Sequence, residues 1–162
     1  MKNVAGKKLI ALAVSVLAMV FASMVYSHCQ IPCGIYDDKA RISMIDEHIA
    51  TIEKSMKQIT ELSAQSEKNF NQIVRWVQNK ENHADYIMEI ASDYFMAQRL
   101  KPVDKPQGQD YEKYVKQLTL LHGLLVYSTK AKQTTDLSNV EKLRTLLAEF
   151  QTVYFEEDIH KH

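Results

Sequence analysis

The residues best equipped for chemistry stand close together near the start of the chain. Both cysteines, Cys29 and Cys33, lie four positions apart, and His28 directly precedes the first of them. Thiolates and imidazoles are common ligands of borderline and soft metal ions. If a protease cuts after Ser27, His28 also gains a free α-amine, which places an amine, an imidazole and two thiols within six residues. The segment therefore predicts a metal site built from a new N-terminus.

The donor set favours some metals over others. The amine, the deprotonated amide nitrogen of Cys29 and the two thiolates can form a planar set of two nitrogens and two sulfurs. Such a set suits nickel(II) or copper(II), whereas zinc prefers a tetrahedron. The imidazole of His28 hangs from the residue that supplies the amine, so it can approach along the axis. An axial nitrogen and two thiolates make a change of oxidation state accessible, which predicts a redox site.

The first 27 residues have the three-part layout of a secretory signal peptide. Lys2, Lys7 and Lys8 give a positive start, and residues 9–25 are uncharged and apolar apart from two serines. An aliphatic residue three positions before the cut and Ser27 directly before it complete the pattern. We therefore expect cleavage and export to a periplasm, a lumen or the extracellular space, with a cytoplasmic location less favoured. The alternative is a retained anchor, because the apolar run is close to the ~18 residues of a membrane span.

Composition limits what the remaining 135 residues can be. Their number is typical of one domain, and the leader holds three of the 20 basic residues and none of the 20 acidic ones, so the mature formal charge is −3. Without a basic stripe, nucleic acid is not an expected partner, and no membrane association is expected after cleavage. Two cysteines are too few for a disulfide scaffold, so an apolar core must hold the fold.

A disulfide between Cys29 and Cys33 is the alternative use of the thiols, since exported thiols usually oxidise. Closing so short a loop stabilises a fold by only about 2 kcal/mol on the chain-entropy model. In that case the protein would be a non-enzymatic exported helical module for metal handling or ligand sensing. A mature chain that starts at His28 with two free thiols and a bound metal would favour the redox metal site over this alternative.

Apolar spacing after the cysteine segment predicts four helices. Asp37 or Asp38 can cap the first, whose apolar residues recur at a 3.5-residue period: Ile42, Ile45, Ile49, Ile52, Met56 and Ile59. The second is expected over about 67–99, with these residues inward: Phe70, Ile73, Val74, Val77, Ala84, Ile87, Met88, Ala91 and Phe95.

Two prolines and a glycine in residues 101–108 end this pattern, and a third helix is expected over about 110–132. Its apolar residues are Tyr114, Val115, Leu118, Leu121, Leu125 and Val126. Ser138 and Glu141 are spaced as a capping box that opens a fourth helix. The predicted fold is all-α: an antiparallel four-helix bundle over residues 37–162, with residues 28–36 as an N-terminal hook outside it.

The hook resembles that of the nickel superoxide dismutase family, whose mature chains begin His-Cys-x-x-Pro-Cys-Gly-x-Tyr. Every fixed position of this motif is present from His28 to Tyr36. The family's Ala-Arg-Ile is seen at residues 40–42 and its Asp-Tyr-Phe at residues 93–95. The resemblance implies a four-helix subunit, a homohexamer and conversion of superoxide to dioxygen and hydrogen peroxide by Ni(II)/Ni(III) cycling, with one nickel ion per chain.

The same resemblance implies the role of each site residue. His28 supplies amine and axial imidazole, Cys29 thiolate and amide nitrogen, and Cys33 the second thiolate. Tyr36 stands at the mouth of the site, where its phenol orders water or substrate, and Tyr94 is similar to a second tyrosine near the metal. Pro32 and Gly34 shape the hook. A leader-processing protease is the implied maturation partner.

Three positions depart from the family's pattern around the axial imidazole. Ser43 stands where some members have a glutamate, so Asp46 or Glu47 is a candidate replacement, and His83 falls near the position of an arginine. Gln30 stands where many members have an acid.

The other histidines and the basic residues carry less specific expectations. His48, His83 and His122 each occur singly within a helical pattern, so we expect surface or hydrogen-bonded side chains rather than extra metal ligands, with His83 as the one to test. Lys39 or Arg99 is a candidate for steering an anion.

Overall fold

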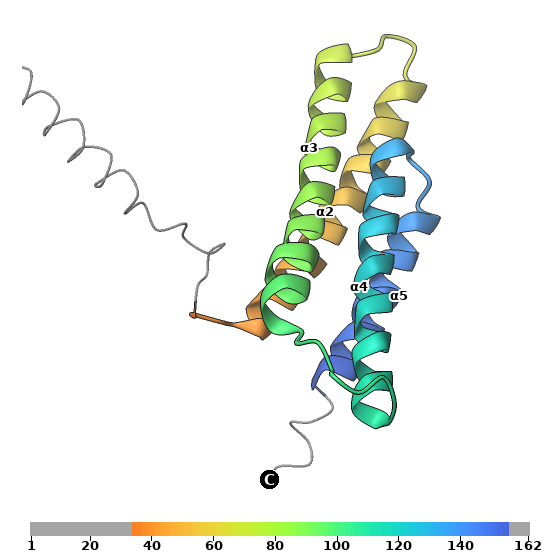
Figure 1. Ribbon diagram of the computed structural model, residues 1–162. Coiled ribbons are helices and arrows are strands. Elements are labelled where there is room, and N and C mark those ends of the chain that lie inside the picture. The colour runs from red at the N-terminus through yellow and green to blue at the C-terminus, as the bar shows by residue number, and fades with distance from the viewer. Residues whose placement is uncertain (1–33, 156–162) are drawn as a thin grey trace, which may run out of the picture. The chain divides into compact units, whose positions relative to one another are not determined.

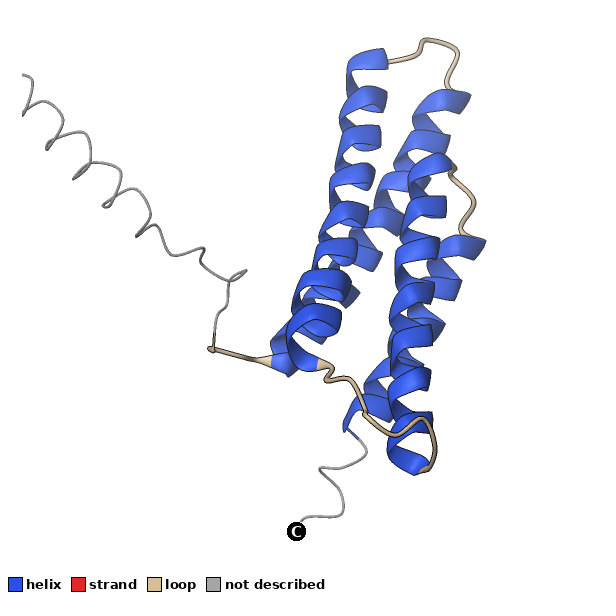
Figure 2. Ribbon diagram, viewed as in Figure 1, coloured by secondary structure: helices blue, strands red, loops and turns tan. Residues whose placement is uncertain are grey.

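The computed structural model describes residues 34–155, and every regular element among them is helical (Figures 1 and 2). These residues form α2 (Asp38–Ala64), α3 (Phe70–Glu89), the π-helix η1 (Ile90–Arg99), α4 (Gln109–Gln133) and α5 (Ser138–Phe155). The part from Tyr36 onward is one unit. The predicted all-α bundle of four helices is confirmed, and between residues 34 and 155 no helix is long and apolar enough to cross a membrane.

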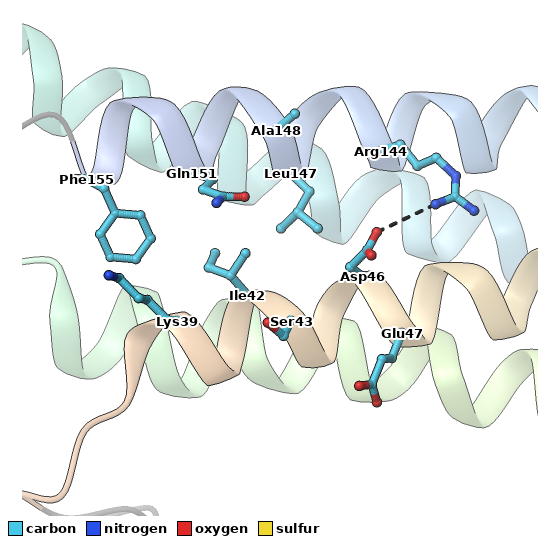
Figure 3. A pocket seen from close by; sticks show the side chains of 10 residues that line it. All are labelled: Lys39, Ile42, Ser43, Asp46, Glu47, Arg144, Leu147, Ala148, Gln151 and Phe155. Atoms are coloured by element: carbon cyan, nitrogen blue, oxygen red, sulfur yellow. Dashed lines mark ion pairs between the residues drawn. The ribbon is translucent and has the colours of Figure 1, made fainter.

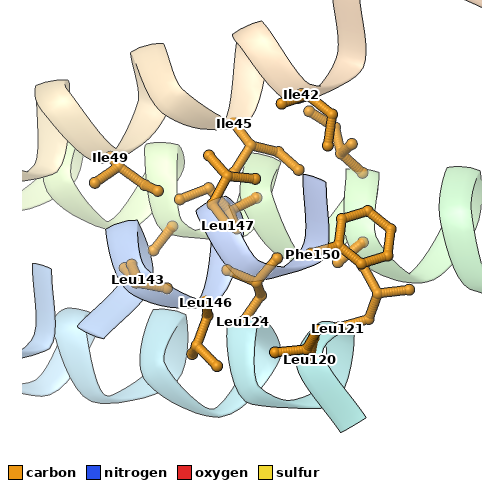
Figure 4. Close-up of a cluster of buried hydrophobic side chains, with 14 of the residues drawn as sticks. Ile42, Ile45, Ile49, Leu120, Leu121, Leu124, Leu143, Leu146, Leu147 and Phe150 are labelled. Carbon is orange, nitrogen blue, oxygen red and sulfur yellow. The ribbon is translucent and has the colours of Figure 1, made fainter. Parts of the chain in front are cut away.

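Each long helix packs against two others. The main contacts join α2 to α3, α3 to α4, α4 to α5 and α5 to α2, so the four helices enclose one core. The isoleucine stripe predicted for the first helix is confirmed, because Ile45, Ile49, Ile52 and Met56 are fully buried. Figure 4 shows Ile42, Ile45 and Ile49 facing leucines of α4 and α5.

An aromatic cluster closes the core at one end of the bundle. The rings of Phe95 and Phe150 meet edge to face with centroids 5.0 Å apart, and the Tyr154 ring lies 5.4 Å from that of Phe95. Edge-to-face contacts add about 0.5–1.5 kcal/mol to the burial of such rings. This cluster fixes η1 against α5, which matters for the site below.

Helix starts follow local side-chain chemistry, with one correction. Asp37 accepts a hydrogen bond from the Ala40 backbone N–H at 2.9 Å, which confirms the predicted cap of α2. The capping box at Ser138 is wrong. Asp136 is the residue that accepts the Ser138 backbone N–H, at 2.9 Å, and Ser138 is already inside α5. Asp136 stands two residues before Ser138 in the turn that leads into α5, and the Glu141 backbone N–H bonds to the Leu137 carbonyl.

The inward face predicted for the second helix is wrong at its N-terminal end. The side chains of Phe70 and Val74 are 69% and 65% exposed. In Figure 1 the upper ends of α2 and α3 extend beyond α4 and α5, so this part of α3 has only α2 beside it. Val115 of α4 is also exposed, and α4 instead buries Leu120, Leu121 and Leu124.

A buried lysine ties α3 to the end of α4. Lys80 is 3% exposed, and its Nζ donates hydrogen bonds to the carbonyls of Ala131, Lys132 and Thr134 at 2.7, 2.6 and 2.8 Å. The last carbonyls of a helix lack intrahelical partners and carry partial negative charge, so a cation there is favourable. Burial lowers the pKa of the Lys80 ammonium, but the three carbonyl acceptors satisfy all of its N–H donors.

Candidate functional site

The proposed metal ligands His28, Cys29 and Cys33 lie outside the described residues, whereas the last two fixed positions of the motif, Gly34 and Tyr36, lie within them. Gly34 has a φ of 78°, in the left-handed region that L-residues rarely adopt. This is the backbone freedom expected of the hook's glycine.

Tyr36 is held between two side chains of η1. The guanidinium carbon of Arg99 lies 4.4 Å from the centroid of the Tyr36 ring, a cation–π contact. The ring of Tyr94 meets the ring of Tyr36 edge to face, with centroids 5.8 Å apart. Tyr36 is nevertheless 41% exposed. Its ring is therefore oriented while part of it remains open to solvent.

Asp38, in the first turn of α2, holds Tyr94 and Arg99 in place by accepting hydrogen bonds from both. Its Oδ1 accepts hydrogen bonds from the Tyr94 hydroxyl at 2.6 Å and from Arg99 Nε at 2.8 Å. Its Oδ2 accepts from Arg99 Nη2 at 2.7 Å and from the Tyr154 hydroxyl at 2.9 Å. One carboxylate thus receives four hydrogen bonds from η1 and α5, including a two-pronged contact from a guanidinium.

The π-helical winding of η1 makes this arrangement possible. Tyr94 and Arg99 are five residues apart, and in an α-helix that offset would turn their side chains about 140° away from each other. In a π-helix the hydrogen bonds run between residues five apart, as from the Leu100 N–H to the Phe95 carbonyl at 2.9 Å. Residues five apart then lie close to one face, and both side chains reach Asp38.

Charge and hydrogen bonding fix the protonation states of this cluster. Burial alone would raise the pKa of the Asp38 carboxyl, but the hydrogen bonds from Arg99, Tyr94 and Tyr154 outweigh it and lower the pKa. Burial and the hydrogen bond to Asp38 raise the pKa of Tyr94 well above its ordinary value and that of Tyr154 to about 12. At neutral pH, Asp38 is therefore an anion, both phenols keep their protons, and Arg99 is a cation.

The basic residues considered for anion steering have other contacts. Arg99 is paired with Asp38, which compensates its charge locally. The ammonium of Lys39 lies 6.0 Å from the Phe155 ring centroid, on the α5 side. Arg41, which the sequence indicated only as part of Ala-Arg-Ile, lies with its guanidinium carbon 5.1 Å from the centroid of Tyr94. Arg41 is therefore the cation that the structure adds beside the tyrosine pair.

The candidate replacements for the family's glutamate line a groove between α2 and α5. The groove has a volume of about 790 Å³, and Ser43, Asp46 and Glu47 are on its α2 wall (Figure 3). Asp46 forms an ion pair with Arg144 at 3.6 Å, and Arg144 also contacts Glu53 at 2.6 Å. Asp46 is thus engaged by α5, and Glu47 points away from that ion pair in Figure 3.

The expectation that the helical histidines are surface or hydrogen-bonded side chains is confirmed, but the sequence did not predict that two of the three contact each other. His48 on α2 and His83 on α3 place their Nδ1 atoms 3.0 Å apart, and Tyr86 packs against both rings. They are 35 residues apart in sequence, so only the packing of α2 on α3 reveals the contact. His122 is exposed on α4.

Sequence reasoning also missed the Asp38 hub, by which we mean Asp38 and the three side chains that donate hydrogen bonds to its carboxylate, from Tyr94, Arg99 and Tyr154. It treated Asp38 as one of two possible caps and Arg99 as a steering cation. The sequence did hold a hint of this role. One of the two adjacent aspartates suffices to cap the helix, as Asp37 does, so the carboxylate of Asp38 remains available for contacts with other helices.

Comparison with known proteins shows the family of this chain. The sequence matches the family model of nickel-containing superoxide dismutase over residues 23–158, which includes the hook motif, the tyrosine pair and the Asp38 hub. The chain belongs to the nickel-containing superoxide dismutase family. It is therefore a nickel-dependent oxidoreductase, and superoxide fits it as substrate. No curated protein and no solved structure matches the chain.

The donor chemistry of this superoxide dismutase fits its metal. Both thiols of the chain, an imidazole and a potential terminal amine occur within residues 28–33, and nitrogen with thiolate sulfur is a suitable ligand set for nickel. Among residues 34–155, no three side chains of His, Cys, Asp or Glu gather into a group that could hold a metal ion.

Proposed function

We propose that this enzyme disproportionates superoxide at a nickel ion held by the hook at residues 28–36. His28 would provide the terminal amine and its imidazole, Cys29 a thiolate and its amide nitrogen, and Cys33 the second thiolate. When bound, one nickel ion per chain supplies one-electron chemistry between Ni(II) and Ni(III). Two superoxide ions and two protons yield one dioxygen and one hydrogen peroxide. Membership of the family, together with the complete hook motif, carries this proposal.

Tyr36 is the hook residue that we assign to ordering water or superoxide at the mouth of the site. The Tyr94 hydroxyl already donates its hydrogen bond to Asp38, and both Tyr94 and Arg99 orient the Tyr36 ring. The role of Tyr94 is therefore to position Tyr36. The partly exposed Tyr36 supports a role in proton supply at a solvent-accessible site.

The site requires cleavage after Ser27, which would leave three parts: a leader at residues 1–27, the hook at 28–36 and the bundle at 37–162. Because the leader has the layout of a signal peptide, we infer export to a periplasm, a lumen or the extracellular space, and a leader-processing protease as partner. Short connections between long helices support an antiparallel order of the bundle, since α2 and α3 are joined by only five residues.

We also infer a homohexamer, as the family resemblance implies. The exposed Phe70 and Val74 at the end of α3 support an apolar contact between subunits. Native mass spectrometry of the mature enzyme tests the subunit number. A protein that remains monomeric at all concentrations would contradict this part of the proposal.

Intact mass, nickel content and activity of the mature protein test the central proposal together. The expected result is a chain that begins at His28, carries two free thiols and one nickel ion, and consumes superoxide. His28→Gln should lower turnover while the helical content stays unchanged, with His122→Gln as the matched control. Full activity of His28→Gln, or of a chain with residues left before His28, would refute the hook assignment.

Membership of an enzyme family argues against the alternative of a non-enzymatic module. A Cys29–Cys33 disulfide in purified, active enzyme would nevertheless contradict the ligand set proposed here, and thiol titration detects it.

A further inference from the structure

A pair of histidines joins the outer faces of α2 and α3, separate from the residues that contact Tyr36. His48 and His83 are both half-buried, so each ring is packed on one side and reachable from solvent on the other. Their Nδ1 atoms lie 3.0 Å apart, and the ring centroids are 4.9 Å apart with an interplanar angle of 69°. Tyr86 packs against both rings at centroid distances of 5.2 and 5.6 Å. The two rings are thus held in place from more than one direction.

At this separation the two Nδ1 atoms share a single proton. One Nδ1 donates and the other accepts, because two protons cannot fit between nitrogens 3.0 Å apart. At least one nitrogen lone pair therefore already points toward the space between the rings. Replacing the shared proton by a metal ion frees the second lone pair, so both imidazoles can bind the same ion.

The distance between the nitrogens selects a class of metal. With metal–nitrogen bonds of about 2.0–2.1 Å, two nitrogens 3.0 Å apart subtend an angle of about 95° at the metal. This angle is that of neighbouring ligands in a square-planar or tetragonal site, the geometry of copper(II) and nickel(II). A tetrahedral zinc ion would need the nitrogens to move apart. The geometry favours copper(II) most, because copper(II) also binds nitrogen ligands the most strongly among these ions.

We propose that His48 and His83 form a second metal site, which binds one copper(II) or nickel(II) ion on the surface of the bundle, with water completing the coordination. The site is distinct from the hook and uses no residue of it. Two protein ligands bind less tightly than the four to five donors of the hook, so the ion in this site exchanges with the solution.

The electrostatics of the pair support metal binding at neutral pH. Burial and the nearby His83 lower the pKa of His48, while the charge of Glu47 opposes this change, and burial lowers the pKa of His83. Protons therefore compete less with the metal for these nitrogens than they do at an ordinary histidine. Glu47 also adds negative charge close to the bound cation.

The test uses the full mature-length chain, in which the hook donors and the C-terminal histidines are replaced and His122 is kept as an internal control. In this background, serine replaces His28, Cys29 and Cys33, and asparagine replaces His160 and His162, which leaves His48, His83 and His122 as its histidines. Titration with copper(II), followed by electron paramagnetic resonance, should show one ion bound by two imidazole nitrogens. In a separate titration with nickel(II) and no zinc, the bound paramagnetic ion should broaden the ring resonances of His48 and His83 in NMR spectra. The resonances of His122 should be unaffected.

Single substitutions in the same background decide the assignment. His48→Asn and His83→Asn should each abolish the two-nitrogen copper spectrum, whereas His122→Asn, on α4, should leave it unchanged. Circular dichroism checks that each variant stays helical. The NMR experiment needs no substitution of His48 or His83, so it tests the site even if a variant fails to fold.

Copper that still binds through two imidazoles in His48→Asn, or an absence of binding in the background protein, would overturn the second site. Because the hook donors are absent from this background, neither result depends on the proposed function. The nickel content of the unsubstituted enzyme tests the hook independently.

Discussion

The guanidinium of Arg99 covers the ring of Tyr36, with 4.4 Å between the guanidinium carbon and the ring centroid. The same guanidinium makes a two-pronged contact with Asp38 at 2.8 and 2.7 Å. Arg99 therefore connects Tyr36, the last residue of the hook, to a carboxylate at the start of α2. The orientation of Tyr36 depends on an interaction that neither the hook nor α2 can make by itself.

Tyr36→Phe tests the role of the phenol directly. We expect turnover to fall by about tenfold, which is less than the ~10²–10⁴-fold typical of a positioned proton donor, because water can still reach the site and supply protons. The free energy of unfolding should change little, since the ring contacts with Arg99 and Tyr94 remain. Stopped-flow decay of superoxide measures the rate at equal nickel content, and an unchanged rate would remove Tyr36 from the site.

Arg99→Lys tests whether the guanidinium positions Tyr36. A lysine keeps the charge but cannot make the two-pronged contact with Asp38 while it covers the ring. The free energy of unfolding in urea should fall by about 1–3 kcal/mol, and turnover should fall as well. Arg75→Lys on the exposed face of α3 is the matched control and should change unfolding by less than about 0.5 kcal/mol. Equal stability of the Arg99→Lys variant and the parent would contradict the hub.

Asp38→Asn should change how stability depends on pH. The pKa of Asp38 is lowered in the folded protein, so the folded state releases this proton more readily than the unfolded chain. Its contribution to stability is then fully present well above 3.8, the ordinary pKa, and is lost as the pH falls through the folded value. At pH 7 we expect Asp38→Asn to cost about 2–4 kcal/mol.

Urea denaturation of Asp38→Asn and the parent between pH 3 and pH 7 measures this difference. The two curves should converge toward the acid end of that range. A constant difference across it would show that Asp38 acts through packing and not through its charge.

Lys80→Met should destabilise the bundle by about 1–3 kcal/mol, because three carbonyls at the end of α4 lose their donor while the aliphatic packing is kept. Lys142→Met on the exposed face of α5 is the control and should have little effect. Hydrogen exchange should show earlier opening near Gln133 in Lys80→Met only. If thermal denaturation gives the same midpoint for both variants, the buried lysine contributes nothing to stability.

The histidine pair should make the apoprotein less stable in mild acid. The pKa values of His48 and His83 are both lowered in the folded state, so the unfolded chain binds more protons as the pH falls below the ordinary value of 6.5. Stability is therefore lost from about pH 6.5 downward. His48→Asn should flatten this slope and His122→Asn should not, as measured by urea denaturation between pH 5 and pH 8 in the presence of a chelator.

The sequence allowed some parts of the fold to be predicted because they depend on local periodicity. The stripe from Ile42 to Ile59 defines a buried face at any helix–helix contact. Asp37 caps α2 by accepting the backbone N–H of the residue three positions later. Phe70 and Val74 were misassigned because their exposure depends on how far α4 extends beside α3. Helical spacing carries no information about the length of a neighbouring helix.

What the sequence determined by itself is the hook motif and the family, because metal ligands within six residues are a local pattern and need no fold to be recognised. Only the tertiary structure decided that Asp38 joins Tyr94, Arg99 and Tyr154, and that His48 meets His83. These contacts span 35 to 116 residues of chain. They arise from the packing of helices and from the π-helical winding of η1, which sets the direction of side chains that an α-helix would have turned apart.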